Sequence, residues 1–304
     1  MFLGTPEFAV PTLAAMLEAG IEVAGVVTQP DRPAGRGQQA SAPPVKRLAV
    51  ERGLPVWQPV KIREPQAVAQ IQEAHPDVLV VVGYGQILPA SIFDHPPLGT
   101  VNVHASLLPK YRGAAPIQWA IANGETRTGV TTMRIEAGLD TGDILLQREA
   151  AIGPEETAPQ LGARLAREGA ALLVETLRGL EAGTIRRRKQ NDAEATYAPL
   201  LKKEDGRVDW TRSARAIADQ VRGFDPWPGA YTTFRGELLH LRSVRVAEGP
   251  AGEPGGLEVA GRSLRVACGK GWLELIALQP EGRKRMTAQE FVNGRQPARG
   301  EKLG

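Results

Sequence analysis

The first two thirds of the chain alternate short apolar runs with longer amphipathic stretches, and this alternation most constrains the fold. Runs rich in β-branched residues at 21–28, 77–83 and 100–105 predict strands, and residues 1–3 predict a first strand that is short for a central one. Helical patterns occupy 6–19, 44–52, 64–74, 115–122 and 157–180. We therefore expect an α/β fold whose N-terminal part is a Rossmann-like open, mostly parallel sheet with flanking helices.

The sequence changes character near residue 184. Residues 184–206 lack periodicity and carry a basic run at 186–189, which is typical of an exposed linker. A helical stretch follows at 213–222, and then short alternating segments separated by glycine and proline. These segments predict a smaller C-terminal OB-like β-barrel. The expected domains are 1–183, a basic linker at 184–206, and the barrel at 207–304.

Composition narrows the class of protein. With 304 residues and 42% hydrophobic content, the chain is long enough to bury a substantial core. It has no apolar run of about 18 residues and no readable secretory signal, so we expect a cytoplasmic protein without a membrane partner. The single cysteine, Cys268, offers neither a disulfide nor a thiolate cluster, and we expect no metal. Lys and Arg outnumber Asp and Glu by 37 to 34, which permits an acidic partner.

One predicted strand ends in two polar residues. Asn102 and His104 are two positions apart and share one face of the strand, at the carboxyl end where open α/β sheets place their ligands. In isolation such a pair is more often a turn cap and a core histidine. The Pro- and Gly-rich loop that follows favours a functional site, and a second loop places Asp140 between Gly138 and Gly142.

These three side chains suit acyl transfer to an amine. A histidine can accept the proton that the attacking amine loses, and an Asn amide and an imidazolium can stabilise the developing oxyanion. A nearby aspartate would orient the ring. No nucleophile elbow surrounds Ser106, so direct attack of the amine is the simplest mechanism.

The motifs resemble those of the folate-dependent formyltransferases. The N-x-H strand followed by SLLPxYRG, the later GLDTGDIL and the opening GTPEFAVPTL all match, and the resemblance covers essentially the whole chain. It implies that Asn102, His104 and Asp140 are catalytic, and that a formyl group passes from 10-formyltetrahydrofolate to the α-amine of methionyl initiator tRNA. The folate site it implies comprises Ser106, Leu107, Leu108, Pro109, Val82, Gly83, Tyr84, Gln86 and Leu88.

Basic residues predict where tRNA would bind. Residues 29–45 form a long excursion rich in glycine and proline, which on composition alone could equally be a solvated surface loop. In the family this loop contacts tRNA, and the phosphate contacts expected of basic side chains should weaken with salt. The implied tRNA-binding residues are Arg32, Arg36, Lys46, Arg187, Arg188 and Lys189. The resemblance assigns catalysis and folate binding to residues 1–183 and tRNA binding to residues 207–304. We expect the protein to be a monomer.

Other functions stay open at this stage. A formyltransferase acting on a nucleotide amino sugar would use the same three residues, but has no need of the basic loop and linker. A hydrolase that releases the formyl group is a further alternative. A nicotinamide-dependent oxidoreductase is excluded because GTPEFA is not a G-x-G-x-x-G motif. A non-enzymatic RNA-binding protein would not require Asn102, His104 and Asp140 together.

Overall fold

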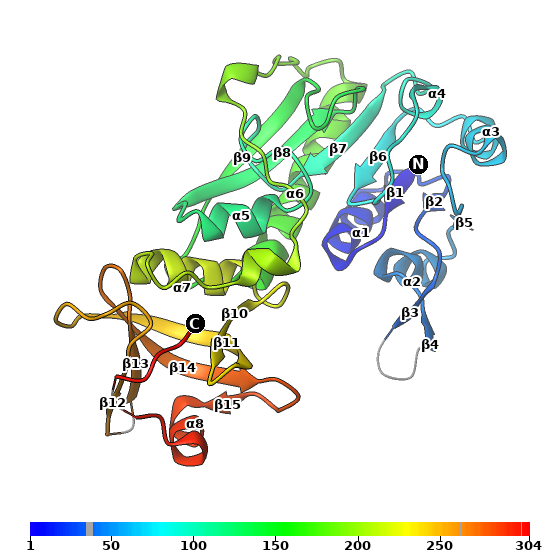
Figure 1. Ribbon diagram of the computed structural model, residues 1–304. Helices are drawn as coiled ribbons and strands as arrows, with labels where there is room; N and C mark the ends of the chain where they lie inside the picture. The colour runs from blue at the N-terminus through cyan, green and yellow to red at the C-terminus, as the bar shows by residue number, and fades with distance from the viewer. Residues whose placement is uncertain (35–38, 262, 299) are drawn as a thin grey trace. The chain divides into compact units, whose positions relative to one another are not determined.

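The computed structural model describes residues 1–34, 39–261, 263–298 and 300–304 (Figure 1). The chain forms two compact units, each assembled from separate segments. Unit 1 contains Met1–Gly113, Arg127–Ala151 and Gly162–Tyr197. Unit 2 contains Ala114–Thr126, Ile152–Leu161 and Ala198–Gly304.

Unit 1 is built on a seven-stranded sheet of order β5-β2-β1-β6-β7-β8-β9. The strands from β5 to β7 pair in parallel, whereas β8 and β9 pair antiparallel at one edge, so the expected mostly parallel sheet is confirmed. In sheet order the strands are β5 (Val56–Trp57), β2 (Val26–Val27), β1 (Phe2–Gly4), β6 (Leu79–Val82), β7 (Thr100–His104), β8 (Arg127–Arg134) and β9 (Ile144–Ala151).

Helices cover both faces of this sheet. On one face Phe2, Val80, Val101 and Val103 pack against α1 and α6, and on the other Leu3, Val81 and their neighbours pack against α3 and α4. Alternate residues of each strand therefore face opposite helix layers. The helices and the small hairpin of this unit are η1 (Glu7–Ala9), α1 (Val10–Glu18), β3 (Arg32–Ala34), β4 (Gln39–Ser41), α2 (Pro44–Glu51), α3 (Pro65–Glu73), α4 (Ala90–Phe93), α6 (Ala158–Glu181, which begins in unit 2) and η2 (Asp192–Glu194).

The predicted helices lie within a few residues of the observed ones, whereas the strands differ more. The first strand is indeed only three residues long although it is central. The strand expected at 21–28 is restricted to Val26–Val27, because its parallel partners β1 and β5 are themselves short. The hairpin of β8 and β9 was not predicted at all.

Unit 2 contains the C-terminal antiparallel sheet, of order β10-β11-β14-β13-β12, with β15 paired to β14. Single bridges join Leu303 to Phe234 in β10 and Lys302 to Gly256 just before β12, so the C-terminus links the two edges as in a barrel. The expected separate β domain is confirmed. Its elements are α5 (Pro116–Ala122), η3 (Lys203–Gly206), α7 (Ala214–Gly223), β10 (Ala230–Phe234), β11 (Glu237–Ala247), β12 (Leu257–Ala260), β13 (Ser263–Ala267), β14 (Trp272–Pro280), β15 (Met286–Thr287) and α8 (Ala288–Arg295).

The described residues contain neither a membrane-spanning helix nor a cluster of metal-binding side chains. Among them, no helix is both long and apolar enough to cross a membrane. The same residues contain no group of three or more His, Cys, Asp or Glu side chains arranged to hold a metal ion.

The closure of the barrel predicts the effect of one substitution. Leu303 is 4% exposed and belongs to the core of unit 2, so Leu303→Ala should lower the free energy of unfolding by about 2–5 kcal/mol. Lys302→Ala is the matched control, because this side chain makes only an exposed ion pair with Glu253 and should change stability by less than about 1 kcal/mol. Urea unfolding measures both, and equal effects would contradict closure by Leu303.

Candidate active site

His104 is the last residue of β7, and its ring is almost completely buried, at 6% exposed. Its Nε2 lies 2.9 Å from the carbonyl oxygen of Tyr111. A carbonyl oxygen can only accept, so Nε2 carries the hydrogen in this contact and Nδ1 of the neutral ring keeps its lone pair. The structure therefore leaves Nδ1 as the nitrogen able to accept a proton.

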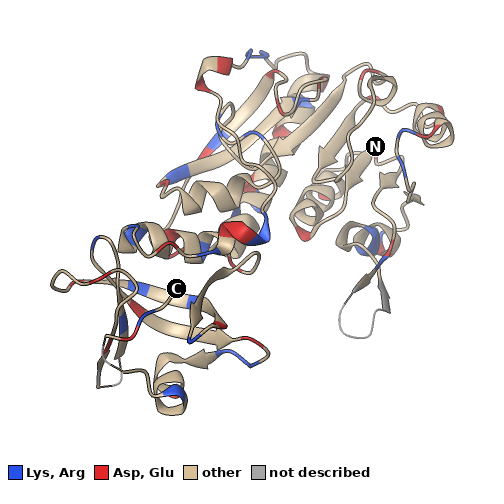
Figure 2. Cartoon of the chain, in the orientation of Figure 1, with Lys and Arg blue, Asp and Glu red and all other residues tan. Residues whose placement is uncertain are grey.

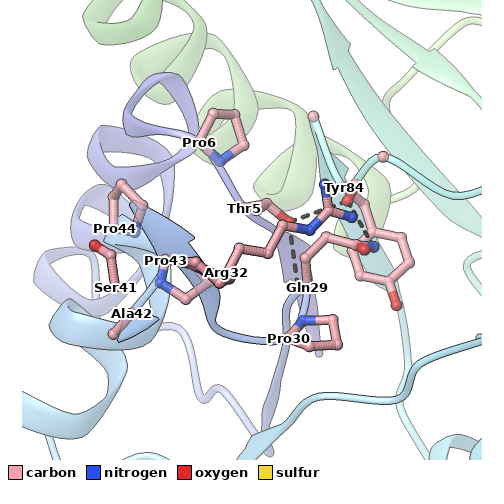
Figure 3. A pocket seen from close by; sticks show the side chains of 13 residues that line it. Thr5, Pro6, Gln29, Pro30, Arg32, Ser41, Ala42, Pro43, Pro44 and Tyr84 are labelled. Carbon is pink, nitrogen blue, oxygen red and sulfur yellow. Dashed lines mark hydrogen bonds between the residues drawn. The ribbon is translucent and has the colours of Figure 1, made fainter. Parts of the chain in front are cut away.

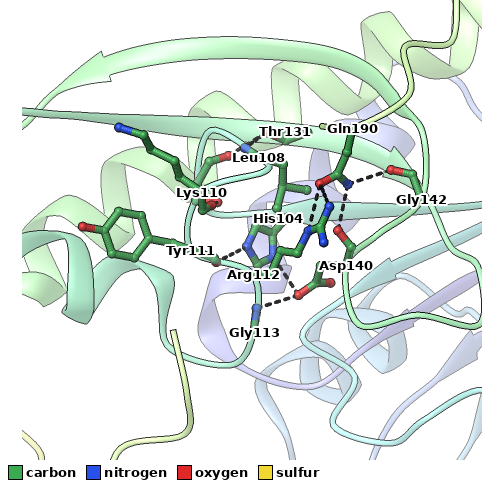
Figure 4. A network of polar contacts seen from close by, with 11 residues as sticks. His104, Leu108, Lys110, Tyr111, Arg112, Gly113, Thr131, Asp140, Gly142 and Gln190 are labelled. Carbon is green, nitrogen blue, oxygen red and sulfur yellow. Dashed lines mark hydrogen bonds and ion pairs between the residues drawn. The ribbon is translucent and has the colours of Figure 1, made fainter. Parts of the chain in front are cut away.

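Asp140 lies beside that nitrogen. Its Oδ2 is 3.7 Å from His104 Nδ1 and accepts a hydrogen bond of 2.8 Å from the backbone N–H of Gly113 (Figure 4). Asp140 has a φ of +51°, a left-handed conformation uncommon for residues other than glycine. A proton taken up at Nδ1 would face a carboxylate. The pair expected from the sequence is thus brought together, from loops about 35 residues apart.

Asn102 is half-buried on β7, two residues before His104. The strand pairs it with Val81 of β6 and Met133 of β8, while Val101 and Val103 face the opposite helix layer. Its amide makes no hydrogen bond to another described residue. The amide is therefore available to a ligand at the end of the strand.

The loop after β7 is shaped by Thr131, a residue that was not predicted. Thr131 Oγ1 donates to the Ser106 carbonyl (2.6 Å) and accepts from the Leu108 N–H (3.2 Å) and from Gln147 Nε2 (3.0 Å). Of the folate-site residues expected in this loop, Ser106 and Leu108 are buried, and Leu107 and Pro109 are half-buried. The Ser106 hydroxyl itself donates to the Lys110 carbonyl.

A buried arginine and glutamine connect this loop to the Asp140 turn, and neither was predicted to contribute. Arg112 is 2% exposed and donates from Nε and Nη2 to Gln190 Oε1, at 3.0 and 2.8 Å. Its Nη2 also forms an ion pair of 2.8 Å with Asp192. Gln190 Nε2 then donates to the carbonyls of Asp140 and Gly142, both at 2.7 Å. The YRG motif contained the only sequence signal, and the partners lie about 80 residues away.

The second expected folate segment follows β6. Val82 ends the strand, Gly83 and Gly85 are exposed with positive φ, and Tyr84 between them is buried. Burial raises the pKa of Tyr84 to about 12, and its hydroxyl has no partner among the described residues. The Gln86 side chain is bonded to the Ile62 N–H and the Val60 carbonyl, and Leu88 is buried. In this segment the exposed groups are therefore the backbone at Gly83 and Gly85 and the side chain of Ile87.

A pocket of about 440 Å³ opens beside Gly83–Gly85 (Figure 3). It lies at the carboxyl ends of β1, β2 and β6. β7 is parallel to these strands, so its last residue, His104, lies at the same end of the sheet. Five prolines form much of its wall, and the Arg32 side chain extends across it toward Thr5 and Tyr84. The lining residues are Thr5, Pro6, Gln29, Pro30, Arg32, Pro33, Ser41, Ala42, Pro43, Pro44, Gly83, Tyr84 and Gly85.

The predicted tRNA-binding residues have different surroundings. Arg32 is exposed, whereas Lys46 on α2 forms an ion pair of 2.8 Å with Asp31. Hydrogen bonds from Gln58 and then Lys46 lower the pKa of Asp31. Arg36 lies outside the described residues. Figure 2 shows the basic residues of α2 near the β3–β4 hairpin.

The linker residues in this set lie along the edge of unit 1. Arg188 pairs with Ile144 at the start of β9, and its side chain contacts Gln147. Arg187 and Lys189, on either side of it, are exposed. The Arg188 side chain is exposed as well, so the linker pairs with β9 through its backbone while all three cations lie at the surface.

Comparison with known proteins identifies the family. Residues 1–177 match the formyl transferase family, and residues 200–296 match the C-terminal domain of formyl transferases. A methionyl-tRNA formyltransferase of Solibacter usitatus is 60% identical over 305 aligned residues, and one of Geobacter metallireducens is 53% identical. Both alignments cover 100% of this chain and 98% of the relative. The chain belongs to the formyl transferase family, in the branch of the methionyl-tRNA formyltransferases. The resemblance seen in the motifs is confirmed.

Solved structures share the fold at much lower identity. An N-formyltransferase from Helicobacter canadensis, in complex with folinic acid and dTDP-3-aminofucose, aligns with a TM-score of 0.68 and 18% identity over 92% of this chain and 98% of that one. The sugar 3N-formyl transferase WlaRD aligns with a TM-score of 0.69 and 18% identity, over 93% and 97%. Identity this low supports the fold alone.

The hydrogen bonds of Thr131 predict that two matched substitutions on β8 differ in their effect on stability. Thr131→Val removes the hydroxyl that Leu108 N–H, Gln147 and the Ser106 carbonyl use, and should lower the free energy of unfolding by about 1–3 kcal/mol. Thr128 is equally buried on the same strand, but its hydroxyl has no partner among the described residues. Thr128→Val should therefore be neutral or stabilising. Chemical denaturation of both variants checks this, and the reverse order of stabilities would refute it.

Proposed function

We propose that this protein transfers a formyl group from 10-formyltetrahydrofolate to the α-amino group of methionyl initiator tRNA. The observation that carries the proposal is the buried His104 with Nδ1 directed at Asp140, next to the free amide of Asn102. Full-length identity of 52–60% to methionyl-tRNA formyltransferases supports the same reaction. The proposal implies a cytoplasmic enzyme of translation initiation, acting as a monomer.

The residues at the end of β7 account for the chemistry. His104 Nδ1 accepts the proton that the attacking amine loses, and the resulting imidazolium is stabilised by Asp140 at 3.7 Å. When the bond between the formyl carbon and N10 of the folate breaks, the imidazolium returns this proton to N10, which releases tetrahydrofolate and restores the neutral ring. The Asn102 amide donates to the carbonyl oxygen on which negative charge develops. The Asp140 carboxyl is held in place because the Gly113 N–H donates to its Oδ2. Water is kept from the ring because His104 is buried.

The folate co-substrate would supply the activated formyl group, and two loops fit a flat heterocycle. Gly83 and Gly85 expose backbone donors and acceptors at the end of β6. Both this loop and the Asp140 loop carry an exposed apolar side chain: Ile87 is 94% exposed and Leu139 is 63% exposed. In a ligand site these two side chains would supply apolar walls for the heterocycle. Residues 82–88, 106–109 and 138–142 would together hold the pterin.

The acceptor end of the tRNA fits the proline-lined pocket. Its volume of about 440 Å³ lies within the range of small-ligand sites, roughly 300–1,000 Å³. Rigid apolar walls suit a methionyl side chain, and Arg32 suits the adjoining phosphate. Arg36, Arg187 and Lys189 would extend the phosphate contacts. We further propose the division of the chain into a catalytic part (1–183), a basic linker (184–206) and a tRNA-binding barrel (207–304).

A formyl transfer assay with two acceptors tests the proposal. We expect formyl-methionyl-tRNA as product, with no product on a nucleotide amino sugar, which is the alternative acceptor. His104→Ala should lower kcat at least about 100-fold, because the general base is lost, and should leave tRNA affinity nearly unchanged. His95→Ala, which changes an exposed histidine of unit 1, is the control. Product on the amino sugar alone would refute the tRNA acceptor but keep the catalytic assignment.

Arg32 makes a separate prediction about the tRNA. Arg32→Ala should weaken methionyl-tRNA binding and make the salt dependence of log Kd shallower by about one phosphate contact, with kcat at saturating tRNA nearly unchanged. Arg52→Ala removes an exposed cation at the C-terminal end of α2, whereas the pocket lies at the N-terminal end. This control should change neither the affinity for methionyl-tRNA nor its salt dependence. Salt titrations of binding measure both variants. An unchanged slope for Arg32→Ala would exclude a phosphate contact at this residue.

A further inference from the structure

We propose that Gln190 is a positioning residue for the reaction: it holds the Asp140 turn so that the carboxylate stays beside His104. This inference rests on the proposed function. Gln190 lies just after the basic run, in the segment that precedes η2, and touches none of the groups expected to react. Its side chain is nevertheless 6% exposed and makes four hydrogen bonds.

The Asp140 turn needs an external support. Asp140 has a φ of +51°, and non-glycine residues keep such a conformation only where the surrounding structure imposes it. Gly142 lies so close to the backbone of Arg134 that a Cβ would be 1.9 Å from its carbonyl oxygen. The turn therefore packs tightly on β8 on one side, and on the other both its carbonyls accept from Gln190 Nε2 at 2.7 Å.

Arg112 determines which way the Gln190 amide faces. A guanidinium only donates, so it selects the amide oxygen and leaves the NH₂ group directed at the two carbonyls. Asp192 balances the buried charge of Arg112 at 2.8 Å. Through Arg112, Gln190 thus links the loop that follows His104 to the backbone of the turn that carries Asp140, while the Gly113 N–H of the same loop bonds to the Asp140 side chain (Figure 4).

Gln190→Glu removes the donors while keeping the size of the side chain. The carboxylate can still accept from Arg112, but it faces the carbonyls of Asp140 and Gly142 with oxygen instead of NH₂. We expect kcat to fall about 10- to 100-fold, because a displacement of about 1 Å at the reacting groups has this effect, and the KM values for folate and tRNA to stay within about twofold. Asn191→Ala is the control. This neighbour caps η2 through the Ala193 N–H and contacts nothing in the Asp140 turn, so kcat should not change.

Gln190→Glu combined with Asp140→Ala tests whether Gln190 acts by positioning Asp140 or only stabilises the fold. If Gln190 acts through Asp140, Gln190→Glu should lower the remaining kcat by no more than about twofold in the Asp140→Ala background. An equal fall in both backgrounds would overturn the proposal, as would an unchanged kcat in the parent protein.

Hydrogen exchange gives a readout that does not depend on activity. The Gly113 N–H donates to Asp140 Oδ2, so its exchange should be faster in Gln190→Glu and unchanged in Asn191→Ala. Protection equal to that of the parent protein would also overturn the proposal. A parent protein that forms no formyl-methionyl-tRNA would instead refute the proposed function, and the exchange experiment would still decide whether Gln190 holds the turn.

Discussion

The buried guanidinium of Arg112 is the constraint on which the architecture of the site depends. A charge with 2% exposure is tolerated only when it is fully paired, and its partners Gln190 and Asp192 come from the segment after α6. Backbone hydrogen bonds join the same two segments. The Arg112 N–H donates to the Thr196 carbonyl, and the Tyr111 N–H donates to the Thr196 hydroxyl. Satisfying this one cation thus brings together the loop after β7, the Asp140 turn and residues 190–196.

The sheet contributes by the direction of its strands. β1, β2, β6 and β7 are parallel, so Gly4, Val27, Val82 and His104 end at one edge. The segments that leave these ends form the proline-lined pocket and the exposed glycines, and His104 is the last residue of β7. An amine acceptor and a formyl donor can therefore bind side by side at these strand ends. The amine can then attack the formyl carbon directly, with no covalent intermediate on the protein.

Local pattern was enough to predict some of these features. Alternation predicted that Asn102 and His104 share one face of β7, and Val101 and Val103 lie in the core on the other face. The glycines around Asp140 predicted an unusual backbone, but the positive φ is at Asp140 itself, and Gly138 and Gly142 are required because a Cβ would clash with Thr141 or Arg134. The longer helices of the catalytic part and α7 were predicted within a few residues because their apolar periodicity is a local property, whereas α4 and α8 were not predicted. The Asn102, His104 and Asp140 roles remain predictions, although the structure brings His104 and Asp140 within 3.7 Å.

Features that depend on distant partners were missed. β8 contains Thr128, Thr131 and Thr132 and looks half polar, yet all three are buried, and Thr131 and Thr132 bond to Ser106 and Thr176. Gln190 ends a run of four cations, and no local pattern shows that it turns inward to meet Arg112. The linker cations at 186–189 are exposed as expected, but no local pattern shows that the backbone of Arg188 pairs with Ile144 of β9. In each case the deciding contact spans 25 or more residues of sequence.

A structure of the protein with a folate analogue and a methionyl-adenosine mimic bound would test the central claim most directly. The account predicts that the α-amine lies about 2.6–3.2 Å from His104 Nδ1, with the Asn102 amide directed at the formyl oxygen. It also predicts that the methionyl side chain enters the proline-lined pocket beside Arg32. An amine bound out of reach of Nδ1, with another side chain at hydrogen-bond distance, would contradict the account.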